Sequence, residues 1–202
     1  MTFILASNNS GKLKEMREML IKLGCDVISQ KEAGLDLDVE ETGTTFEENA
    51  FLKAEAACKG SGLPAIADDS GLCVEALFGE PGVYSARYAG ENKTDKERNE
   101  YLLEKMRDKK DRRAKFVSTV AVVFPNGDRI STSGECHGEL LYAPKGKNGF
   151  GYDPLFYVAE FDSTMAEMEP EIKNSISHRG RAIAALGEKL KKYLEVNENA
   201  DK

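Results

Sequence analysis

Tryptophan is absent from this 202-residue sequence, and histidine occurs only twice. The four cysteines, Cys25, Cys58, Cys73 and Cys136, form no C-x-x-C pair. A zinc site or a disulfide framework built on closely spaced cysteines is therefore not expected. The pattern favours a protein of a reducing compartment.

Long apolar runs are also missing. No stretch approaches the ~20 apolar residues that a membrane-spanning helix requires. The N-terminus shows no basic region followed by a long apolar core, so no signal peptide is expected. These absences favour a cytoplasmic protein with no membrane partner.

The sequence lacks an excess of basic residues. Lysine and arginine number 28 against 35 aspartates and glutamates, which gives a net charge of −7. This balance argues against binding to nucleic acid, although a few converging cations can still hold a small anion. With 41% apolar residues, the chain is typical of a globular protein. We expect one domain over residues 1–195 and a polar tail over residues 196–202.

Apolar segments of strand and helix length follow one another along the chain. Strands are predicted over residues 2–6, 27–28, 63–67, 116–124, 129–141 and 152–158. Helices are predicted over residues 12–23, from Thr44 or Thr45 to just before Gly60, over 94–106 on the solvated side, and over 177–193. Pro125-Asn126-Gly127-Asp128 predicts a hairpin. The fold class is therefore α/β, with a mixed sheet and flanking helices.

The turn Ser7-Asn8-Asn9-Ser10-Gly11-Lys12 joins the first strand to the first helix. Free N–H groups and the positive end of a helix favour a phosphate there, and Lys12 adds a full charge. The spacing is not that of a Walker A loop. A phosphate-binding turn and an ordinary capped helix both remain open.

Acidic residues form a second candidate site. Asp68-Asp69-Ser70-Gly71 follows a predicted buried strand, where α/β proteins tend to bind ligands. Carboxylates suit Mg²⁺, and Glu40 or Glu41 is a further candidate ligand. A turn with local hydrogen bonds is the alternative for the aspartates. Lys53 is either catalytic or simply solvated.

A third candidate site combines aromatic and basic residues. In Gly149-Phe150-Gly151-Tyr152-Asp153, two aromatics among glycines can form a stacking surface for a flat base, although such aromatics more often lie in a core. Lys173 precedes Ser177-His178-Arg179, which opens the last predicted helix. Cations are unfavourable at a helix N-terminus, and this local conflict indicates function.

Taken in order, these segments resemble the inosine/xanthosine triphosphate pyrophosphatases, the non-canonical purine NTP pyrophosphatase family. The similarity runs from about Phe3 to Leu194. The segments that carry it are Ser7-x-Asn9-x-Gly11-Lys12, Thr45-Phe46-Glu47-Glu48-Asn49-Ala50, Asp68-Asp69-Ser70-Gly71-Leu72, Gly82-Val83-Tyr84-Ser85-Ala86-Arg87, Gly149-Phe150-Gly151-Tyr152-Asp153 and Ser177-His178-Arg179.

The resemblance implies an elongated α/β fold whose two lobes flank a central cleft, and a homodimer. It implies a Mg²⁺-dependent hydrolase that converts ITP, dITP and XTP to the monophosphate and pyrophosphate and so cleans the nucleotide pool. By the same resemblance, Asp69 is the proton acceptor and a metal ligand, Glu41 is the other metal ligand, and Lys53 binds phosphate. The implied substrate-binding residues are Ser7, Asn8, Asn9, Ser10, Gly11, Lys12, Ser70, Phe150, Gly151, Tyr152, Asp153, Lys173, His178 and Arg179.

The chemistry of the residues agrees with this activity. Lys12, Lys53 and Mg²⁺ can neutralise a triphosphate, while Asp69, helped by Asp68 or Glu41, orients a water molecule. Hypoxanthine presents a carbonyl where adenine presents an amino group, so a donor such as Arg179 or His178 would discriminate between them. Two alternatives stay open: a Maf-like nucleotide pyrophosphatase with another base preference, and a non-catalytic nucleotide-binding module.

Overall fold

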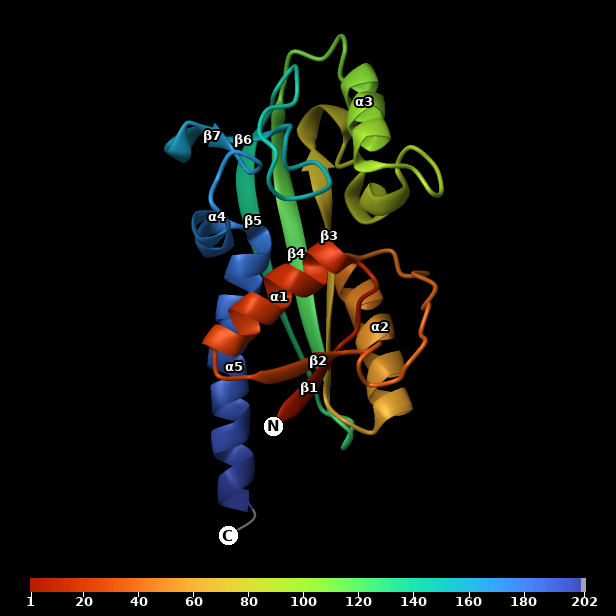
Figure 1. The fold of residues 1–202 in the computed structure, drawn as a ribbon, viewed down its shortest axis with the longest axis vertical. Coiled ribbons are helices and arrows are strands. Elements are labelled where there is room, and N and C mark those ends of the chain that lie inside the picture. The colour runs from red at the N-terminus through yellow and green to blue at the C-terminus, as the bar shows by residue number, and fades with distance from the viewer. Residues whose placement is uncertain (201–202) are drawn as a thin grey trace. The chain divides into compact units, whose positions relative to one another are not determined.

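A computed structural model of the protein describes the backbone of residues 1–200 and the side chains of residues 1–196. Within this range the strands form one open mixed sheet in the order β2-β1-β3-β4-β5-β6-β7 (Figure 1). The strands are β1 (Thr2–Leu5), β2 (Asp26–Ser29), β3 (Ala65–Val74), β4 (Arg113–Val123), β5 (Arg129–Leu140), β6 (Phe156–Val158) and β7 (Ser163–Thr164). The helices are α1 (Ser10–Lys22), α2 (Phe46–Ser61), α3 (Asp95–Lys105), α4 (Pro170–Ile176) and α5 (His178–Ala200). The prediction of a mixed α/β sheet with flanking helices is confirmed.

The sheet combines parallel and antiparallel pairs. β1 runs parallel to β2 and to β3, whereas β6 is antiparallel to β5 and β7. Parallel neighbours need a crossover connection, and the segments that contain α1 and α2 supply it. Both helices therefore begin just after, or lead into, a strand of this part of the sheet.

The chain divides into two compact units. Unit 1 comprises residues 1–69, 118–134 and those from 179 onward, and unit 2 comprises residues 70–117 and 135–178. β3 passes from unit 1 to unit 2 between Asp69 and Ser70, and α5 begins where the chain last returns to unit 1, between His178 and Arg179.

The core of unit 1 has two layers, one on each face of its strands. Side chains alternate along β1, so Phe3 and Leu5 pack with α1 and α5, while Ile4 and Ala6 pack with α2 (Figure 1). Buried strands of a sheet covered on both faces read as continuous apolar runs, which explains the unbroken run at residues 3–6.

The core of unit 2 involves α3 directly. Leu102 and Met106, four residues apart, are fully buried and cluster with Tyr152 and Phe156. The prediction that residues 94–106 lie on the solvated side is therefore wrong for one stripe of this helix. Two apolar residues at helical spacing are enough to bury this side of the helix, although many of its other residues are charged.

Several boundaries differ from prediction. β3 continues through residues 68–71, although the predicted strand ended at residue 67. α2 includes Gly60 and ends at Ser61, and its C-cap Gly62 has a φ of 70°. The predicted strand at residues 152–158 begins only at Phe156. α4 and β7 had no counterpart in the predicted elements. They are short, and such elements depend on tertiary packing more than on local pattern.

Other local predictions are confirmed. Thr45 caps α2, with Glu48 completing a capping box, and Gly127 adopts the positive φ of a hairpin turn. α5 starts at His178 as expected and continues to Ala200. The last two residues of the expected tail, 201 and 202, lie outside the described residues. Within the described range, no helix is both long and apolar enough to span a membrane.

Candidate active site

In unit 1, two carboxylates meet at one ammonium group. Lys53 Nζ lies 2.6 Å from Glu41 Oε1 and 3.0 Å from Asp69 Oδ1, and it donates to the backbone oxygen of Asp68 at 2.9 Å. Burial lowers the pKa of Lys53, but the carboxylates of Asp69 and Glu41 outweigh burial and raise it. Lys53 therefore stays charged between the two acids.

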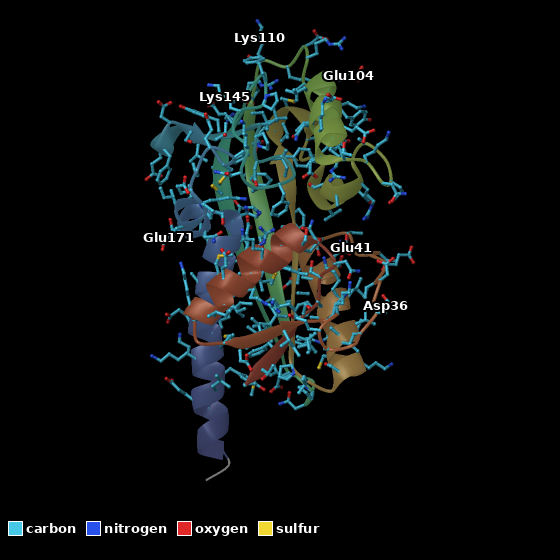
Figure 2. The ribbon with its side chains drawn as sticks, in the orientation of Figure 1. Asp36, Glu41, Glu104, Lys110, Lys145 and Glu171 are labelled. Carbon is cyan, nitrogen blue, oxygen red and sulfur yellow. The ribbon has the colours of Figure 1, made fainter. Side chains whose placement is uncertain are left out.

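Glu41 reaches this position from the loop that leads into α2 (Figure 2). Its neighbour Glu40 is exposed, whereas Glu41 is only partly so and contacts Lys53. Of the two glutamates that the sequence left as alternatives, Glu41 is thus the one beside Asp69.

Asp68 is a buried acid with cationic partners. Its Oδ2 lies 2.9 Å from Lys12 Nζ and 3.3 Å from Arg179 Nη2, and its Oδ1 accepts a hydrogen bond from Ser118. Burial by itself raises the pKa of Asp68, but Arg179 and Lys12 reverse this and hold it well below its usual value. Asp68 is therefore a fixed negative charge.

Asp69 behaves oppositely to its neighbour. Burial, and then the nearby Glu41 carboxylate, raise the pKa of Asp69, although Lys53 and Lys12 lower it. Two adjacent carboxyl groups with pKa values pushed apart are typical of sites that assign different acid–base roles. Asp69 is the better proton acceptor of the pair. We call Lys12, Glu41, Lys53, Asp68 and Asp69 the acid–lysine cluster.

The donor set of the acid–lysine cluster suits a hard divalent cation. Glu41 and Asp69 already converge on one positive charge, and Mg²⁺ is usually held by one or two carboxylates together with waters and substrate phosphates. Among the described residues, no group of three or more His, Cys, Asp or Glu side chains is arranged to enclose a metal ion. A cation here would thus depend on the substrate for further ligands.

The turn before α1 is built partly by its own side chains. The Asn9 side chain caps α1 by accepting the Lys12 N–H at 3.0 Å, and Ser7 Oγ accepts the Asn9 N–H. Asn8 donates to the Leu37 oxygen and accepts from Gln30, which ties the turn to the loop that carries Glu41. The backbone of this turn, rather than its asparagine side chains, is thus the part suited to a phosphate.

In unit 2, the segment Gly149–Asp153 forms what we call the aromatic loop. Asp153 Oδ2 accepts the Phe150 N–H at 2.8 Å and lies 2.5 Å from Lys173 Nζ, and the same ammonium is 5.1 Å from the centre of the Phe150 ring. Gly149 and Gly151 have φ values of 73° and 62°, which favour glycine. The loop therefore holds the Phe150 backbone in a fixed conformation.

α3 holds the same loop from its other side. The Gly151 N–H donates to Asp95 Oδ2 at 2.7 Å, and Asn99 Nδ2 donates to the Gly151 oxygen at 2.9 Å. Tyr152 is buried and its hydroxyl donates to the Ser85 oxygen. Phe150 is thus the partly exposed aromatic of the loop, while Tyr152 belongs to the core.

A family model described as the Ham1 family matches residues 3–189. The chain belongs to the Ham1 family. The family resemblance drawn from the order of the motifs is confirmed.

Relatives of this Ham1 chain match it over nearly the full length. It is 48% identical over 201 residues to a protein of Clostridium perfringens named dITP/XTP pyrophosphatase. The aligned region covers 96% of this chain and 98% of the relative. A protein of Thermus thermophilus with the same name is 51% identical over 193 residues, covering 95% and 92% of the two chains. The solved structure of the Staphylococcus aureus Ham1 protein superposes with a TM-score of 0.85 at 48% identity, covering 96% of this chain and all of that one.

The last predicted site residues of this Ham1 chain fall into different units. His178, in unit 2, is 5% exposed, and its ring stacks on that of Phe116 with centroids 4.7 Å apart. Arg179, in unit 1, is 2% exposed and lies 2.5 Å from Glu15 and 3.3 Å from Asp68. Ser70 is partly exposed and directly follows Asp69 in β3.

Some residues that support the candidate site could not be predicted from the sequence. Glu15 and Ser118 contact Arg179 and Asp68, and Asn99 supports the aromatic loop. Asn49 belongs to one of the motif segments, yet nothing in the sequence showed what its side chain contacts. Each of these contacts joins residues far apart along the chain, so local patterns do not reveal them.

Proposed function

We propose that this protein hydrolyses dITP, ITP and XTP to the nucleoside monophosphate and pyrophosphate. The relatives that it matches over nearly their whole length are named dITP/XTP pyrophosphatase. The observation that carries the proposal is the convergence of Glu41 and Asp69 on Lys53, next to the Lys12–Asp68 pair. Acids and lysines in this arrangement suit a metal-assisted attack on a polyphosphate.

In the proposed reaction, a water molecule attacks the α-phosphorus and Asp69 accepts its proton. The bond between the α-phosphorus and the oxygen that bridges to the β-phosphorus breaks, and pyrophosphate leaves with that oxygen. The raised pKa of Asp69 supports its role as the proton acceptor. Lys12 and Lys53 bind phosphate oxygens, and the backbone of the turn before α1 supports the same phosphates.

The proposed cofactor is Mg²⁺, held by Glu41 and Asp69. When bound, the ion neutralises charge on the triphosphate and lowers the pKa of a bound water. Lys53 contacts both acids, so it also keeps their carboxylates close together when they would otherwise repel each other. Asp68 keeps Lys12 and Arg179 in place as the charged partner of both.

For the purine base, we propose the aromatic loop, with Phe150 as the stacking surface, Lys173 as the polar group beside its ring, and His178 as a further base-side residue that the resemblance implies. The contacts of Phe150 with Asp153 and Lys173 support this role. Arg179 was predicted to read the base, but its contacts with Glu15 and Asp68 support a structural role instead, in which it pairs with these acids and steadies the fold. We assign Arg179 to that role.

The test is a panel of nucleotides scored for pyrophosphate release with Mg²⁺. We expect ITP, dITP and XTP to be cleaved well, ATP and GTP poorly, and chelation to abolish turnover. Preference for UTP or dTTP would indicate a Maf-like specificity, and binding without pyrophosphate release would indicate a non-catalytic module. Release of orthophosphate with inosine diphosphate would contradict attack at the α-phosphorus.

A homodimer in the cytoplasm completes the proposal. It is supported by the resemblance to the pyrophosphatase family. Light scattering of the purified chain should give twice the mass of one chain. A monomer at micromolar concentration would contradict it.

A further inference from the structure

Asn49 is a fully buried amide next to the acid–lysine cluster. It lies in the first turns of α2, and its residue exposure is 0%. Burying a primary amide is unfavourable unless its polar atoms form hydrogen bonds. Both ends of this amide do so, and neither bond is made to its own helix.

One bond reaches Asp69, and the other reaches the loop that carries Glu41. Asn49 Oδ1 accepts the Gly43 N–H at 2.8 Å, and Asn49 Nδ2 donates to Asp69 Oδ2 at 3.4 Å. Because the Gly43 N–H is the group that faces Asn49, the oxygen of the amide must accept it, and the NH₂ group must face the carboxylate. Gly43 is two residues beyond Glu41. The side chain thus links the loop that carries Glu41 to the strand that carries Asp69.

The approach of this loop to Asn49 is close. A Cβ atom placed on Gly43 would lie 2.6 Å from Asn49 Oδ1 and 2.7 Å from the Glu48 Cβ. Only glycine fits at this distance. The capping box fixes the adjoining residues, because the Glu48 carboxylate accepts the N–H groups of Thr44 and Thr45. The position of the loop is therefore set by α2.

The bond to Asp69 also determines which carboxylate oxygen faces Glu41. Asp69 Oδ2 is turned toward Asn49, while Oδ1 lies beside Lys53 Nζ, where Glu41 Oε1 also lies. We propose that Asn49 is a positioning residue that sets the distance and orientation of Glu41 and Asp69 for a divalent cation. The proposal rests on the proposed function, in which these two acids hold the metal. A neutral donor serves this purpose because it orients Asp69 without adding a positive charge that would repel the cation.

The experiment measures metal binding directly, with Mn²⁺ as the probe. The full chain, free of nucleotide, is titrated with Mn²⁺ and the free ion is followed by its electron paramagnetic resonance signal. Mg²⁺ dependence of pyrophosphate release from ITP and the melting temperature are measured on the same samples. Removing a hydrogen bond to a metal-binding side chain typically lowers metal affinity or activity roughly 10- to 100-fold.

We expect Asn49→Ala and Asn49→Leu, which keeps a similar shape but lacks both polar atoms, to weaken Mn²⁺ binding about tenfold or more. The Mg²⁺ concentration for half-maximal activity should rise with it, while KM for ITP at saturating Mg²⁺ changes less. Gly43→Ala should act in the same direction by displacing the loop. It tests the same contact should the Asn49 variants fail to fold.

The matched control is Thr132→Val. Thr132 is also buried in unit 1, and its hydroxyl donates to the Ala182 oxygen at 2.8 Å, away from the acid–lysine cluster. This variant should lower the melting temperature without changing Mn²⁺ affinity. Folded Asn49 and Gly43 variants with the Mn²⁺ affinity of the original protein would overturn the proposal.

A second pair of variants separates this failure from failure of the proposed function. Glu41→Gln and Asp69→Asn should each reduce Mn²⁺ binding. If they do and the Asn49 variants do not, only the role of Asn49 is wrong. If Glu41→Gln and Asp69→Asn bind Mn²⁺ normally, the metal site of the proposed function is wrong, and the role of Asn49 is overturned with it.

Discussion

α2 in unit 1 and α3 in unit 2 begin with the same local chemistry. Thr45 and Thr94 cap the two helices, and each has a glutamate three residues later that completes a capping box. Each helix then carries a buried asparagine that bonds a glycine backbone elsewhere in its unit: Asn49 binds Gly43, and Asn99 binds Gly151. Similar sequences at the start of a helix thus support two different kinds of site.

The difference lies in what else each asparagine contacts. Asn49 uses both ends of its amide and reaches Asp69, whereas Asn99 Oδ1 has no hydrogen-bond partner among the described residues. In unit 1, Asn49 lies beside the acid–lysine cluster. In unit 2, Asn99 supports the aromatic loop. We therefore expect changes in unit 1 to affect the chemical step and changes in unit 2 to affect substrate binding.

The largest effect should come from Arg179→Ala in unit 1. Removing this side chain breaks its buried ion pairs with Asp68 and Glu15, and breaking a buried ion pair costs about 3–5 kcal/mol. Denaturant unfolding should show that loss in the free energy of unfolding. The ratio of kcat/KM for ITP to that for ATP should stay unchanged, since Arg179 is engaged by acids. A compressed ratio would restore Arg179 as a base-reading residue.

A matched pair of acids gives the next largest effect. Asp69→Asn should lower kcat roughly 10²-fold or more, because a proton acceptor and metal carboxylate is lost. Asp153→Asn makes the same change to a buried acid with a lysine partner in unit 2. It should mainly raise KM for ITP. Steady-state kinetics of both variants at saturating Mg²⁺ test the comparison, and equal losses of kcat would contradict it.

Asn99→Ala should have a smaller effect of the same kind as Asp153→Asn. It removes one neutral hydrogen bond to Gly151, worth about 0.5–1.5 kcal/mol, or roughly two- to tenfold in KM. The Mg²⁺ concentration for half-maximal activity should not move. A shift in that concentration would show that support of the aromatic loop is not specific to binding.

The smallest effect should come from the helix caps. Thr94→Ala and Thr45→Ala each remove a side-chain acceptor at a helix N-terminus, which costs about 1 kcal/mol. Thermal melting should show similar losses for both. Only Thr45→Ala should also change the Mg²⁺ dependence, because Thr45 adjoins the loop that carries Glu41. A change for Thr94→Ala instead would reverse the assignment of the two units.

The sequence by itself determined the features that depend on neighbouring residues. Caps such as Thr45, the hairpin turn at Gly127 and the apolar run of β1 follow from local hydrogen bonding, backbone freedom and side-chain alternation. The order of the motifs also determined the family. These signals are short in range, so they can be read without knowing the fold.

Only the tertiary structure decided how distant residues pair. Lys53 meets Glu41 and Asp69, Arg179 meets Glu15 and Asp68, and Asn49 meets Gly43 and Asp69. It also showed that Asp68 and Asp69 lie within β3, because lysines, an arginine and a serine satisfy acids that otherwise end a strand. Their opposite pKa shifts follow from partners and burial. Such Coulombic effects depend on distances in space, which the order of residues does not contain.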